Sequence, residues 1–419
     1  MGQVTPKSGP QVWRGRIAVV AALLVFVGVV LPAAVATPSA AAAASVEGSA
    51  PREEPSPPVA VTCGLSQTTV VYGAGITVSG EVSPAIEGQS VAITLGGTDV
   101  ATAITAADGG FAVAFSPSHG GDVVARLVTD GTASPAQRLV VRPKVTITYG
   151  TPIPFLDLRY VVKLAPASYS GVITTTVMHN GARVVRLRKK VQDGKAVFTL
   201  PLRGVGLFTV KSSSAAVDEL GARTVAKGLR ARSVKLSVGS SGPHVRGLLT
   251  ALQRLKIRVP SVGTRLNRDC GDAVMAFQKA YRLPRTYVVD GDDWRKLDVA
   301  KPVRPRYSRP YDHLEVDKGR QILMLVRGGA VRGLIAVSTG ATGNTPEGRF
   351  VIQQKHPYTT SGYGGILFRT MGFYGNFAIH GYVPVPPYPA SHGCIREPMW
   401  VADWVYDRAS LGERLYVYR

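Results

Sequence analysis

Apolar positions alternate with polar or small ones along much of the first half of the chain. Within residues 60–142 this period of two runs through 76–82, 91–95 and 111–115, and glycine-containing segments such as 108–110 separate the runs. Successive side chains of a strand point to opposite faces, so the alternation indicates strands with one buried face, joined by hairpin turns. Residues 60–142 are therefore predicted to form a small immunoglobulin-like β-sandwich.

Residues 143–230 carry the same period and are predicted to form a second β module. Ile173–Met178 and Ala182–Leu187 flank the dipeptide Asn180-Gly181. Asn-Gly is the strongest two-residue signal for a hairpin. The two β segments share no clear internal identity, so tandem sandwiches and one larger sheet domain both fit the pattern.

The apolar period changes to 3.6 residues between 232 and 298. After Ser241-Gly242-Pro243, apolar residues between Val245 and Leu255 mark one face of a helix, and proline is well suited to a helix start. A second helix is expected to follow, with Asp269 or Asp272 as its N-cap. We interpret residues 232–298 as a small helical module.

Strands return after a stretch rich in proline and arginine. Residues 299–310 include the run KPVRPRYSRP and are expected to form a semi-rigid linker. Residues 311–419 show strand patterns with one late helix that starts at Pro398. The chain is thus predicted to be a mainly β, multidomain protein with two immunoglobulin-like β-sandwich-type modules, a small helical module and a C-terminal β domain.

The N-terminus has the parts of a secretory signal. Basic residues precede the apolar run Ile17–Leu31, and small residues follow it. A slightly longer helix would reach the ~30 Å of a hydrocarbon core, so an uncleaved anchor is the alternative to cleavage. We assign residues 1–36 to a signal peptide or signal anchor, and the Ala/Pro-rich residues 37–59 to a flexible linker.

Composition narrows the classes of protein. The 419 residues include 49 Lys and Arg against 27 Asp and Glu, which gives a net charge of +22, and 45% are hydrophobic. This apolar content excludes a fully disordered chain, and a single long apolar stretch excludes a multi-pass membrane protein. Basic chains often bind nucleic acid, but a secretory N-terminus places this chain outside the membrane. We therefore expect anionic wall polymers or phospholipid headgroups as its acidic partners, and no nucleic acid.

Candidate chemistry lies in two short motifs. Phe377–Gly381 and Ser391–Arg396 place two histidines and one cysteine within 15 residues, in a chain with 7 His and 3 Cys. A cysteine nucleophile reacts as the thiolate, and an imidazole can take its proton. On an extended strand His392 and Cys394 would share one face, and His380 lies across a proline-rich loop.

Other interpretations of these residues exist. A single cysteine is more often a buried small hydrophobe, and a single histidine is more often structural. A metal site of two histidines and one cysteine is a further alternative. It leaves the proline-rich spacer unexplained and places the positive charge of Arg396 beside a cation. We therefore expect no metal.

The motifs of residues 311–419 resemble those of the L,D-transpeptidase (YkuD-type) catalytic domain of bacterial cell-wall enzymes. The family signature is His-Gly, a variable loop, and Ser/Thr-His-Gly-Cys followed by an apolar residue and Arg or Asn. This chain has His380-Gly381 and then Ser391–Arg396. The segments HLEVDKGRQILMLVRGG, VSTGATGNTPEGRF and YGNFAIHG also match. The resemblance implies a mixed β-sandwich with little helix.

The helical segment also resembles a known module. Its pieces VGSSGPHVRGLLTALQRL, AVMAFQKAYRLP and VDGDDWRKL are similar to the small helical peptidoglycan-binding module. A helical spacer without a ligand is the alternative. Residues 232–298 carry a net charge of +7, which would suit an anionic wall.

The resemblance assigns roles to the motif residues. Cys394 would be the nucleophile, and His380 the general base that later acts as an acid. His392 would orient or polarise the site. Backbone N–H groups of His392, Gly393 and Cys394 would form an oxyanion hole. Ser391 is expected to brace the loop by hydrogen bonds.

Arg396 has two candidate roles. It would hold a substrate carboxylate or brace the loop, and the sequence does not choose between them. Tyr358, Phe368, Phe373 and Tyr374 are candidates for an acceptor groove, with core packing as the alternative.

The resemblance further implies a reaction on peptidoglycan stem peptides in the cell wall or periplasmic space, by a secreted or N-terminally anchored enzyme. Cys394 would attack after the third stem residue, release D-alanine and form a thioester, which a neighbouring stem resolves into a 3→3 cross-link. No cofactor is implied, and carbapenem β-lactams are implied as covalent inhibitors. The alternatives are an L,D-carboxypeptidase or exchange enzyme, and a non-catalytic wall-binding protein.

Two expectations concern the rest of the chain. Cys63 and Cys270 either pair across domains or stay as free thiols. A fragment that begins near Tyr307 is expected to fold and to become acylated by itself, because every motif residue follows it.

Overall fold

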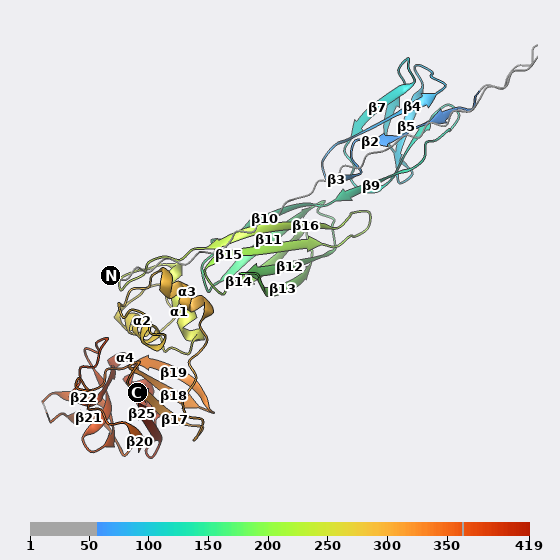
Figure 1. Cartoon of the computed structure of the whole chain (residues 1–419). Coiled ribbons are helices and arrows are strands. Elements are labelled where there is room, and N and C mark those ends of the chain that lie inside the picture. Colours follow the sequence, from blue (N-terminus) through green and yellow to red (C-terminus); the bar gives the residue numbers. More distant parts are fainter. Residues whose placement is uncertain (1–56, 363) are drawn as a thin grey trace, which may run out of the picture. The chain divides into compact units, whose positions relative to one another are not determined.

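The computed structural model describes residues 57–362 and 364–419 (Figure 1). The predicted signal segment 1–36 and nearly all of the linker 37–59 lie outside the described residues. Strands dominate the described part of the chain, as the alternation of apolar residues predicted, and four helices accompany them. None of the helices among these residues is long and apolar enough to cross a membrane.

Residues 60–142 form two sheets. One has the strand order β1-β4-β2 with β7 paired to β4, and the other has the order β3-β9-β8-β5-β6. Alternate residues of β4 are buried, among them Val78 and Val82, which explains the period of two. The strands are β1 (Ala60–Val61), β2 (Gly64–Leu65), β3 (Thr69–Val71), β4 (Ile76–Ser83), β5 (Ser90–Leu95), β6 (Thr98–Ile104), β7 (Gly110–Phe115), β8 (Gly121–Leu127) and β9 (Gln137–Arg142).

Residues 144–231 form two further sheets, with the orders β10-β11-β14 and β13-β12-β15-β16. The predicted Asn-Gly hairpin joins β12 to β13. Asn180 and Gly181 both have positive φ, 49° and 77°, as a tight two-residue hairpin turn requires. The strands are β10 (Lys144–Tyr149), β11 (Asp157–Ala165), β12 (Val172–His179), β13 (Ala182–Lys190), β14 (Lys195–Pro201), β15 (Gly206–Ser214) and β16 (Arg223–Ala231).

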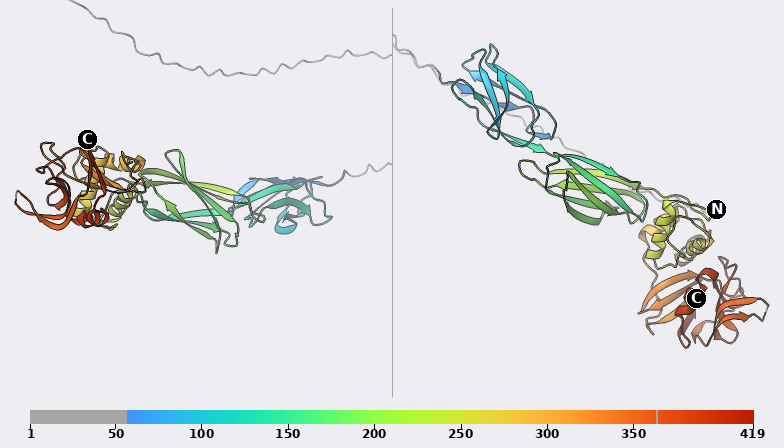
Figure 2. Two further views of the ribbon diagram at one scale, coloured as in Figure 1. Left: turned by 90° about the horizontal axis from the view of Figure 1, so that it is seen from below. Right: turned by 180° about the vertical axis from the view of Figure 1, so that it is seen from behind.

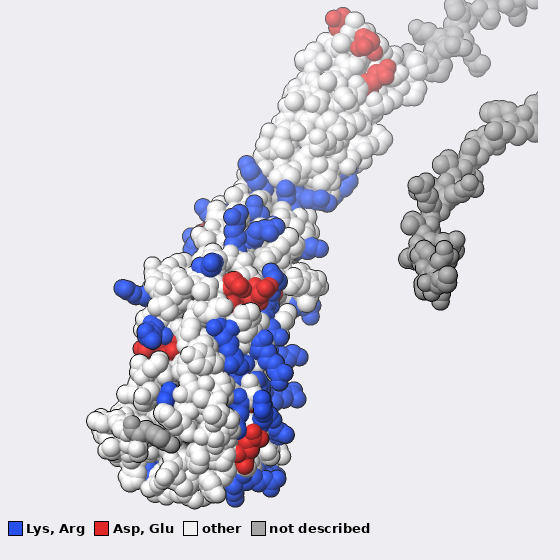
Figure 3. Space-filling view, turned by 60° about the vertical axis from the view of Figure 1, so that its left-hand side comes forward, with Lys and Arg blue, Asp and Glu red and all other residues white. Residues whose placement is uncertain are grey.

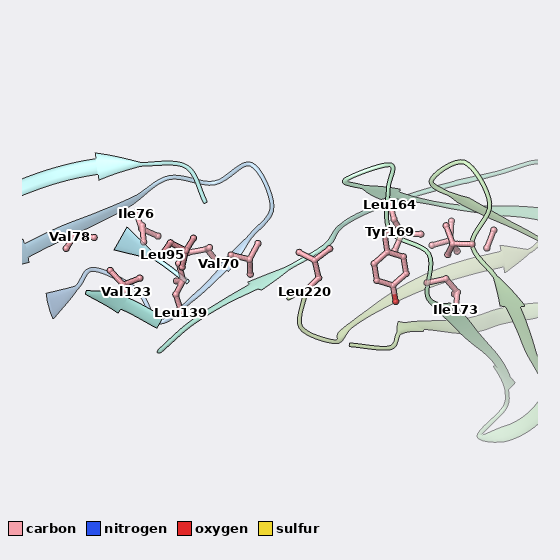
Figure 4. Close-up of a cluster of buried hydrophobic side chains, with 14 of the residues drawn as sticks. Val70, Ile76, Val78, Leu95, Val123, Leu139, Leu164, Tyr169, Ile173 and Leu220 are labelled. Atoms are coloured by element: carbon pink, nitrogen blue, oxygen red, sulfur yellow. The ribbon is translucent and has the colours of Figure 1, made fainter. Parts of the chain in front are cut away.

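One hydrophobic cluster includes residues of both β segments. Leu220 lies between the side chains of the first segment and Leu164, Tyr169 and Ile173 of the second (Figure 4). Its backbone forms a bridge with Val141 at the end of β9. The two β segments therefore share apolar contacts at their junction.

Three helices follow: α1 (Pro243–Arg254), α2 (Arg268–Ala280) and α3 (Gly291–Val299). Pro243 begins α1, as predicted. The expected caps of α2 were wrong: Asn267 is the N-cap, and its Oδ1 accepts a hydrogen bond from Cys270 N at 2.9 Å. Asp269 and Asp272 lie in the helix instead.

The C-terminal residues form two sheets and one helix, with the strand orders β19-β18-β17-β25-β20 and β21-β22-β23-β24. Core residues from both sheets and from α4 pack together. The elements are β17 (His313–Asp317), β18 (Ile322–Arg327), β19 (Ala330–Ala336), β20 (Gly348–Val351), β21 (Gln354–Thr360), β22 (Ile366–Tyr374), β23 (Phe377–Tyr382), β24 (Ile395–Pro398), α4 (Met399–Arg408) and β25 (Arg414–Tyr418).

The helices α1–α3 and the C-terminal sheet share a second hydrophobic core. In Figure 2 these helices lie next to the orange strands of that sheet. Ile322, Met324 and Leu334, from β18 and β19, are fully buried in one cluster with residues of α1 and α2. Ile257 also bridges to Leu334 on the edge strand β19, with Leu334 N donating to Lys256 O at 2.8 Å. The helical segment therefore covers one face and one edge of this sheet.

Candidate active site

Strand pairing brings the two predicted reactive residues together. Strands β23 and β24 run parallel, with His380 opposite Arg396 and Ile379 opposite Ile395. Cys394 precedes β24 directly, and continuing the register places it opposite Ala378, two residues before His380. His380 and Cys394 both line one cleft of about 770 Å³.

His380 is held as a neutral base. Its side chain is buried, and Nδ1 lies 3.1 Å from the carbonyl oxygen of Gly381. A carbonyl only accepts, so Nδ1 carries the proton and Nε2 is left as the basic nitrogen. Burial lowers the pKa of His380 from its ordinary value, and the nearby positive charge of Arg396 lowers it further.

Cys394 is held as a thiol. Its Sγ lies 3.7 Å from the carbonyl oxygen of Asn376, to which the S–H donates. Burial raises the pKa of Cys394, and this outweighs the lowering by the Ala378 N–H and by the charge of Arg396. The two shifts favour a neutral thiol beside a neutral imidazole, which is the arrangement for general-base activation during attack.

A bend, and not a strand, carries the Ser-His-Gly-Cys motif. Ser391 Oγ donates to Cys394 O at 2.5 Å and accepts from Gly393 N at 3.0 Å, so Ser391 braces the bend. Gly393 has a φ of 139°, and a Cβ there would lie 2.5 Å from Phe377 Cε1. The expected strand geometry for His392 and Cys394 was therefore wrong, because glycine turns the chain between them.

This bend also affects the predicted oxyanion hole. The Gly393 N–H is engaged by Ser391 Oγ, at 3.0 Å, inside the motif. The role of an oxyanion donor stays a prediction for the N–H groups of His392 and Cys394, and both residues line the cleft.

Asn344 and Thr345 are further residues at the site that were not predicted from the sequence. Asn344 Nδ2 donates to His392 O at 2.8 Å, and Thr345 Oγ1 donates to Gly393 O at 2.6 Å. These bonds fix two successive carbonyl groups within the bend. The segment VSTGATGNTPEGRF contains both residues, but its match to the family gave no sign of which polar side chains reach the motif.

Arg396 provides the positive charge of the cleft. Its backbone pairs with Ser338 through two bonds of 2.9 Å, and its guanidinium carbon lies 4.4 Å from the ring centroid of Tyr382. Arg396 also lines the cleft that holds His380 and Cys394. The geometry is compatible with both predicted roles, since the backbone of Arg396 braces the loop and the residue borders the cleft.

The aromatic residues that line the cleft are not the ones that were candidates for an acceptor groove from the sequence. Phe377 and Tyr382 line it, whereas Tyr358, Phe368, Phe373 and Tyr374 are not among its lining residues. Phe373 is buried in the core. Tyr358 packs on Phe368, with ring centroids 5.5 Å apart.

The loop between His380 and Ser391 is bound by the helical segment. Tyr287 Oη donates to Val385 O at 3.2 Å, and Lys279 Nζ donates to Pro386 O at 3.2 Å. Arg285 Nη1 donates to Pro387 O at 2.7 Å. Three donors from α2 and the chain after it thus hold three successive carbonyl groups of the loop.

The expectation for a fragment from Tyr307 stays a prediction, and this contact and the shared core favour the opposite outcome. Its sheet would lose the cover of α1 and α2, and its active-site loop would lose these three donors. The other two cysteines are free thiols, Cys63 half-buried and Cys270 buried, so the alternative without a disulfide holds. No group of three or more His, Cys, Asp or Glu side chains in the described part of the chain is arranged to bind a metal.

Comparison with known proteins identifies the C-terminal domain. The family profile of the L,D-transpeptidase catalytic domain, YkuD, matches residues 311–417. A solved L,D-transpeptidase from Xylanimonas cellulosilytica is 30% identical, with 45% of this chain and 98% of that chain covered and a TM-score of 0.43. Residues 311–417 of the chain therefore belong to the YkuD family of L,D-transpeptidase catalytic domains.

Two further solved structures are more distant. An L,D-transpeptidase from Stackebrandtia nassauensis is 19% identical, with 44% of this chain and 95% of that chain covered and a TM-score of 0.30. An L,D-transpeptidase from Mycobacterium smegmatis is 13% identical, with 66% of this chain and 99% of that chain covered and a TM-score of 0.25. None of the curated proteins compared with the chain matches it.

Proposed function

We propose that the protein forms 3→3 cross-links in peptidoglycan through a thioester on Cys394. His380 Nε2 takes the thiol proton as Sγ bonds to the carbonyl carbon of the third residue of a tetrapeptide stem. The bond from that carbon to the D-alanine nitrogen breaks, and the proton passes from His380 to the departing amine. The side-chain amine of a third residue on a neighbouring stem then attacks the thioester, loses a proton to His380 and restores the thiol.

The observation that carries this proposal is that a half-buried thiol lines the same cleft as a buried imidazole whose Nε2 is the basic nitrogen. Covalent catalysis also suits a site outside the membrane, where no ATP is available. The thioester retains the free energy of the broken amide until an amine acceptor arrives.

The acceptor defines the alternative activity. If water resolves the thioester, the product is a tripeptide, and if a free D-amino acid resolves it, the product is an exchanged tetrapeptide. Incubation of the protein with disaccharide-tetrapeptide, followed by mass spectrometry, tests the proposal. A dimer that has lost one D-alanine supports transpeptidation, and tripeptide alone supports the carboxypeptidase.

We further propose that the protein is secreted or anchored at its N-terminus and works within the wall. The excess of Lys and Arg lies after the first β segment: residues 143–419 carry a net charge of +24, and residues 60–142 carry −3. Figure 3 shows Lys and Arg gathered along one side of this later part of the molecule, while the first β segment is largely uncharged in that view.

This distribution supports an anionic wall polymer as a partner. Exposed charges are screened within ~10 Å at 0.1 M salt, so retention on isolated cell walls should weaken as salt rises. Retention that is independent of salt would contradict an electrostatic partner.

Carbapenem β-lactams are the proposed covalent inhibitors. Their strained ring amide offers Cys394 Sγ a carbonyl like that of the stem, and ring opening leaves the acyl group on sulfur. A mass adduct on Cys394 that is lost in Cys394→Ala provides the test.

A further inference from the structure

A second cavity lies between the helical segment and the catalytic domain. Its volume is about 730 Å³, within the range of small-molecule sites. The helical segment contributes one wall, from Val238, the start of α2 and Tyr287. The other wall comes from the loop at Tyr382–Pro387 and from the junction of β24 and α4.

The catalytic wall is apolar and aromatic. Trp400, Met399, Tyr382 and a series of prolines line it, and Tyr287 adds another ring from the helical wall. Flat aromatic and proline surfaces pack well against the C–H faces of a sugar ring and against acetyl methyl groups. These residues therefore provide an uncharged surface for packing against a sugar ring.

The helical wall adds polar groups to the cavity. Asp269, Asp272 and Arg268 line it. Trp400 Nε1 donates to Asp272 Oδ2 at 3.2 Å, which fixes this carboxylate at the junction of the two walls. Burial raises the pKa of Asp272 to about 6, so it is mainly ionised at neutral pH and acts only as an acceptor. Sugar hydroxyl and amide groups are donors of the kind that such carboxylates bind.

The cavity adjoins the catalytic cleft. Tyr382 lines both, and its ring lies 4.4 Å from the guanidinium carbon of Arg396 in the cleft. A substrate with a peptide and a sugar part is therefore able to reach both spaces across one side chain.

We propose that this cavity binds an N-acetylated amino sugar of the glycan strand whose stem peptide enters the catalytic cleft. The inference rests on the proposed function and extends it, because it makes the helical segment part of substrate recognition. A stem attached to its glycan should then react faster than the same peptide without sugar.

The test compares two substrates, disaccharide-tetrapeptide and the free tetrapeptide, with a carbapenem as a third reagent. Val238 lines the helical wall of the cavity, and its side chain is 50% exposed. The larger side chain of Val238→Trp should fill the cavity from this wall without touching the dyad. We expect the kcat/KM for the disaccharide substrate to fall about tenfold, to the value for the free tetrapeptide. The rates for the tetrapeptide and the carbapenem should not change.

Val299→Trp is the matched control, since Val299 is 70% exposed, belongs to the same helical segment and does not line the cavity. A second variant, Asp269→Ala, should reduce the same preference without adding bulk. Binding of the free disaccharide to Cys394→Ala, measured by saturation-transfer NMR, should be lost with Val238→Trp added.

The outcomes separate the two proposals. A wild-type protein with no preference for the disaccharide substrate, or a preference that Val238→Trp leaves intact, overturns the sugar site. Acylation by the carbapenem in either case leaves the catalytic proposal standing. A wild-type protein that no substrate acylates overturns the catalytic proposal, and disaccharide binding to Cys394→Ala would still report on the cavity.

Discussion

Lys279 of α2 donates to Pro386 O at 3.2 Å and so joins the helical segment to the loop between the candidate base and nucleophile. The same Nζ donates to Val337 O at 2.8 Å, and the side chain is completely buried. Burial lowers the pKa of Lys279 to about 7, because the charged ammonium loses its hydration inside the interface. The position of the active-site loop therefore depends on a residue outside the catalytic domain.

Replacement of this amine should impair catalysis. Lys279→Met keeps most of the apolar stem but removes the donor to Val337 O, which is buried, and to Pro386 O, which is partly buried, at up to ~1–3 kcal/mol each. We expect slower acylation by a carbapenem, with alkylation of Cys394 by iodoacetamide nearly unchanged. Lys235→Met, at an exposed lysine of the same segment, is the control. Equal acylation rates in both variants would show that the loop does not need this contact.

Two truncated forms of the protein should differ in folding and in acylation. A fragment of residues 232–419 retains the shared core, apart from Phe155, and the donors to the loop, so it should fold and form an acyl-enzyme. A fragment of residues 307–419 exposes Ile322, Met324 and Leu334, which are fully buried in the whole chain. It should bind a hydrophobic dye and acylate poorly. A shorter fragment that unfolds cooperatively and acylates at the full rate would contradict the shared core.

The sequence predicted local features well and long-range contacts poorly. Asn180-Gly181 and Pro243 have conformational preferences of their own, so their hairpin and helix start were predictable. Lys279 resembles any surface lysine in sequence, because its partners lie more than 50 residues away. The bend at Gly393 was missed for a similar reason: Phe377, across the fold, excludes a side chain there.

The cap of α2 illustrates competition between equivalent local signals. Asn267, Asp269 and Asp272 are all suitable N-cap residues, and the pattern of apolar residues alone does not choose among them. The candidate dyad was predictable as a pair of residues, whereas its neutral state depends on burial, which only the fold determines.

The pH dependence of acylation should report the lowered pKa of His380. The imidazole must be neutral to accept the thiol proton, so activity rises with pH through this pKa. Because burial and Arg396 lower the pKa, the acid limb should lie below the ordinary histidine value of about 6.5. In Arg396→Gln the acid limb should move to higher pH. Stopped-flow acylation from pH 4 to 9 measures both, and an unshifted limb in the variant would contradict the electrostatic role.

Glu397 should make stability depend on pH. Both carboxyl oxygens are buried without a hydrogen-bond partner, and burial raises its pKa well above the ordinary value. The folded state therefore keeps a proton that the unfolded state releases above about pH 4.5, so this group destabilises the fold as pH rises. Glu397→Gln should raise Tm at pH 8, by about 2–4 °C per kcal/mol gained, and change it less at pH 4.5.

Asp407→Asn, at an exposed carboxylate, is the control for this effect. Thermal unfolding followed by circular dichroism at both pH values gives the comparison. An equal change in Tm at pH 4.5 and pH 8 for Glu397→Gln would show that ionisation of this group is not the cause.

The most direct measurement of the central claim is the rate of acyl-enzyme formation on disaccharide-tetrapeptide, followed by intact-protein mass spectrometry. The wild type should gain a disaccharide-tripeptide adduct on Cys394 as D-alanine is released, and Cys394→Ala should gain none. His380→Ala should acylate about 10²–10⁴-fold more slowly, while His392→Ala, with nucleophile and base intact, should be intermediate. An adduct that persists in Cys394→Ala, or near-normal acylation in His380→Ala beside an inactive His392→Ala, would contradict the account.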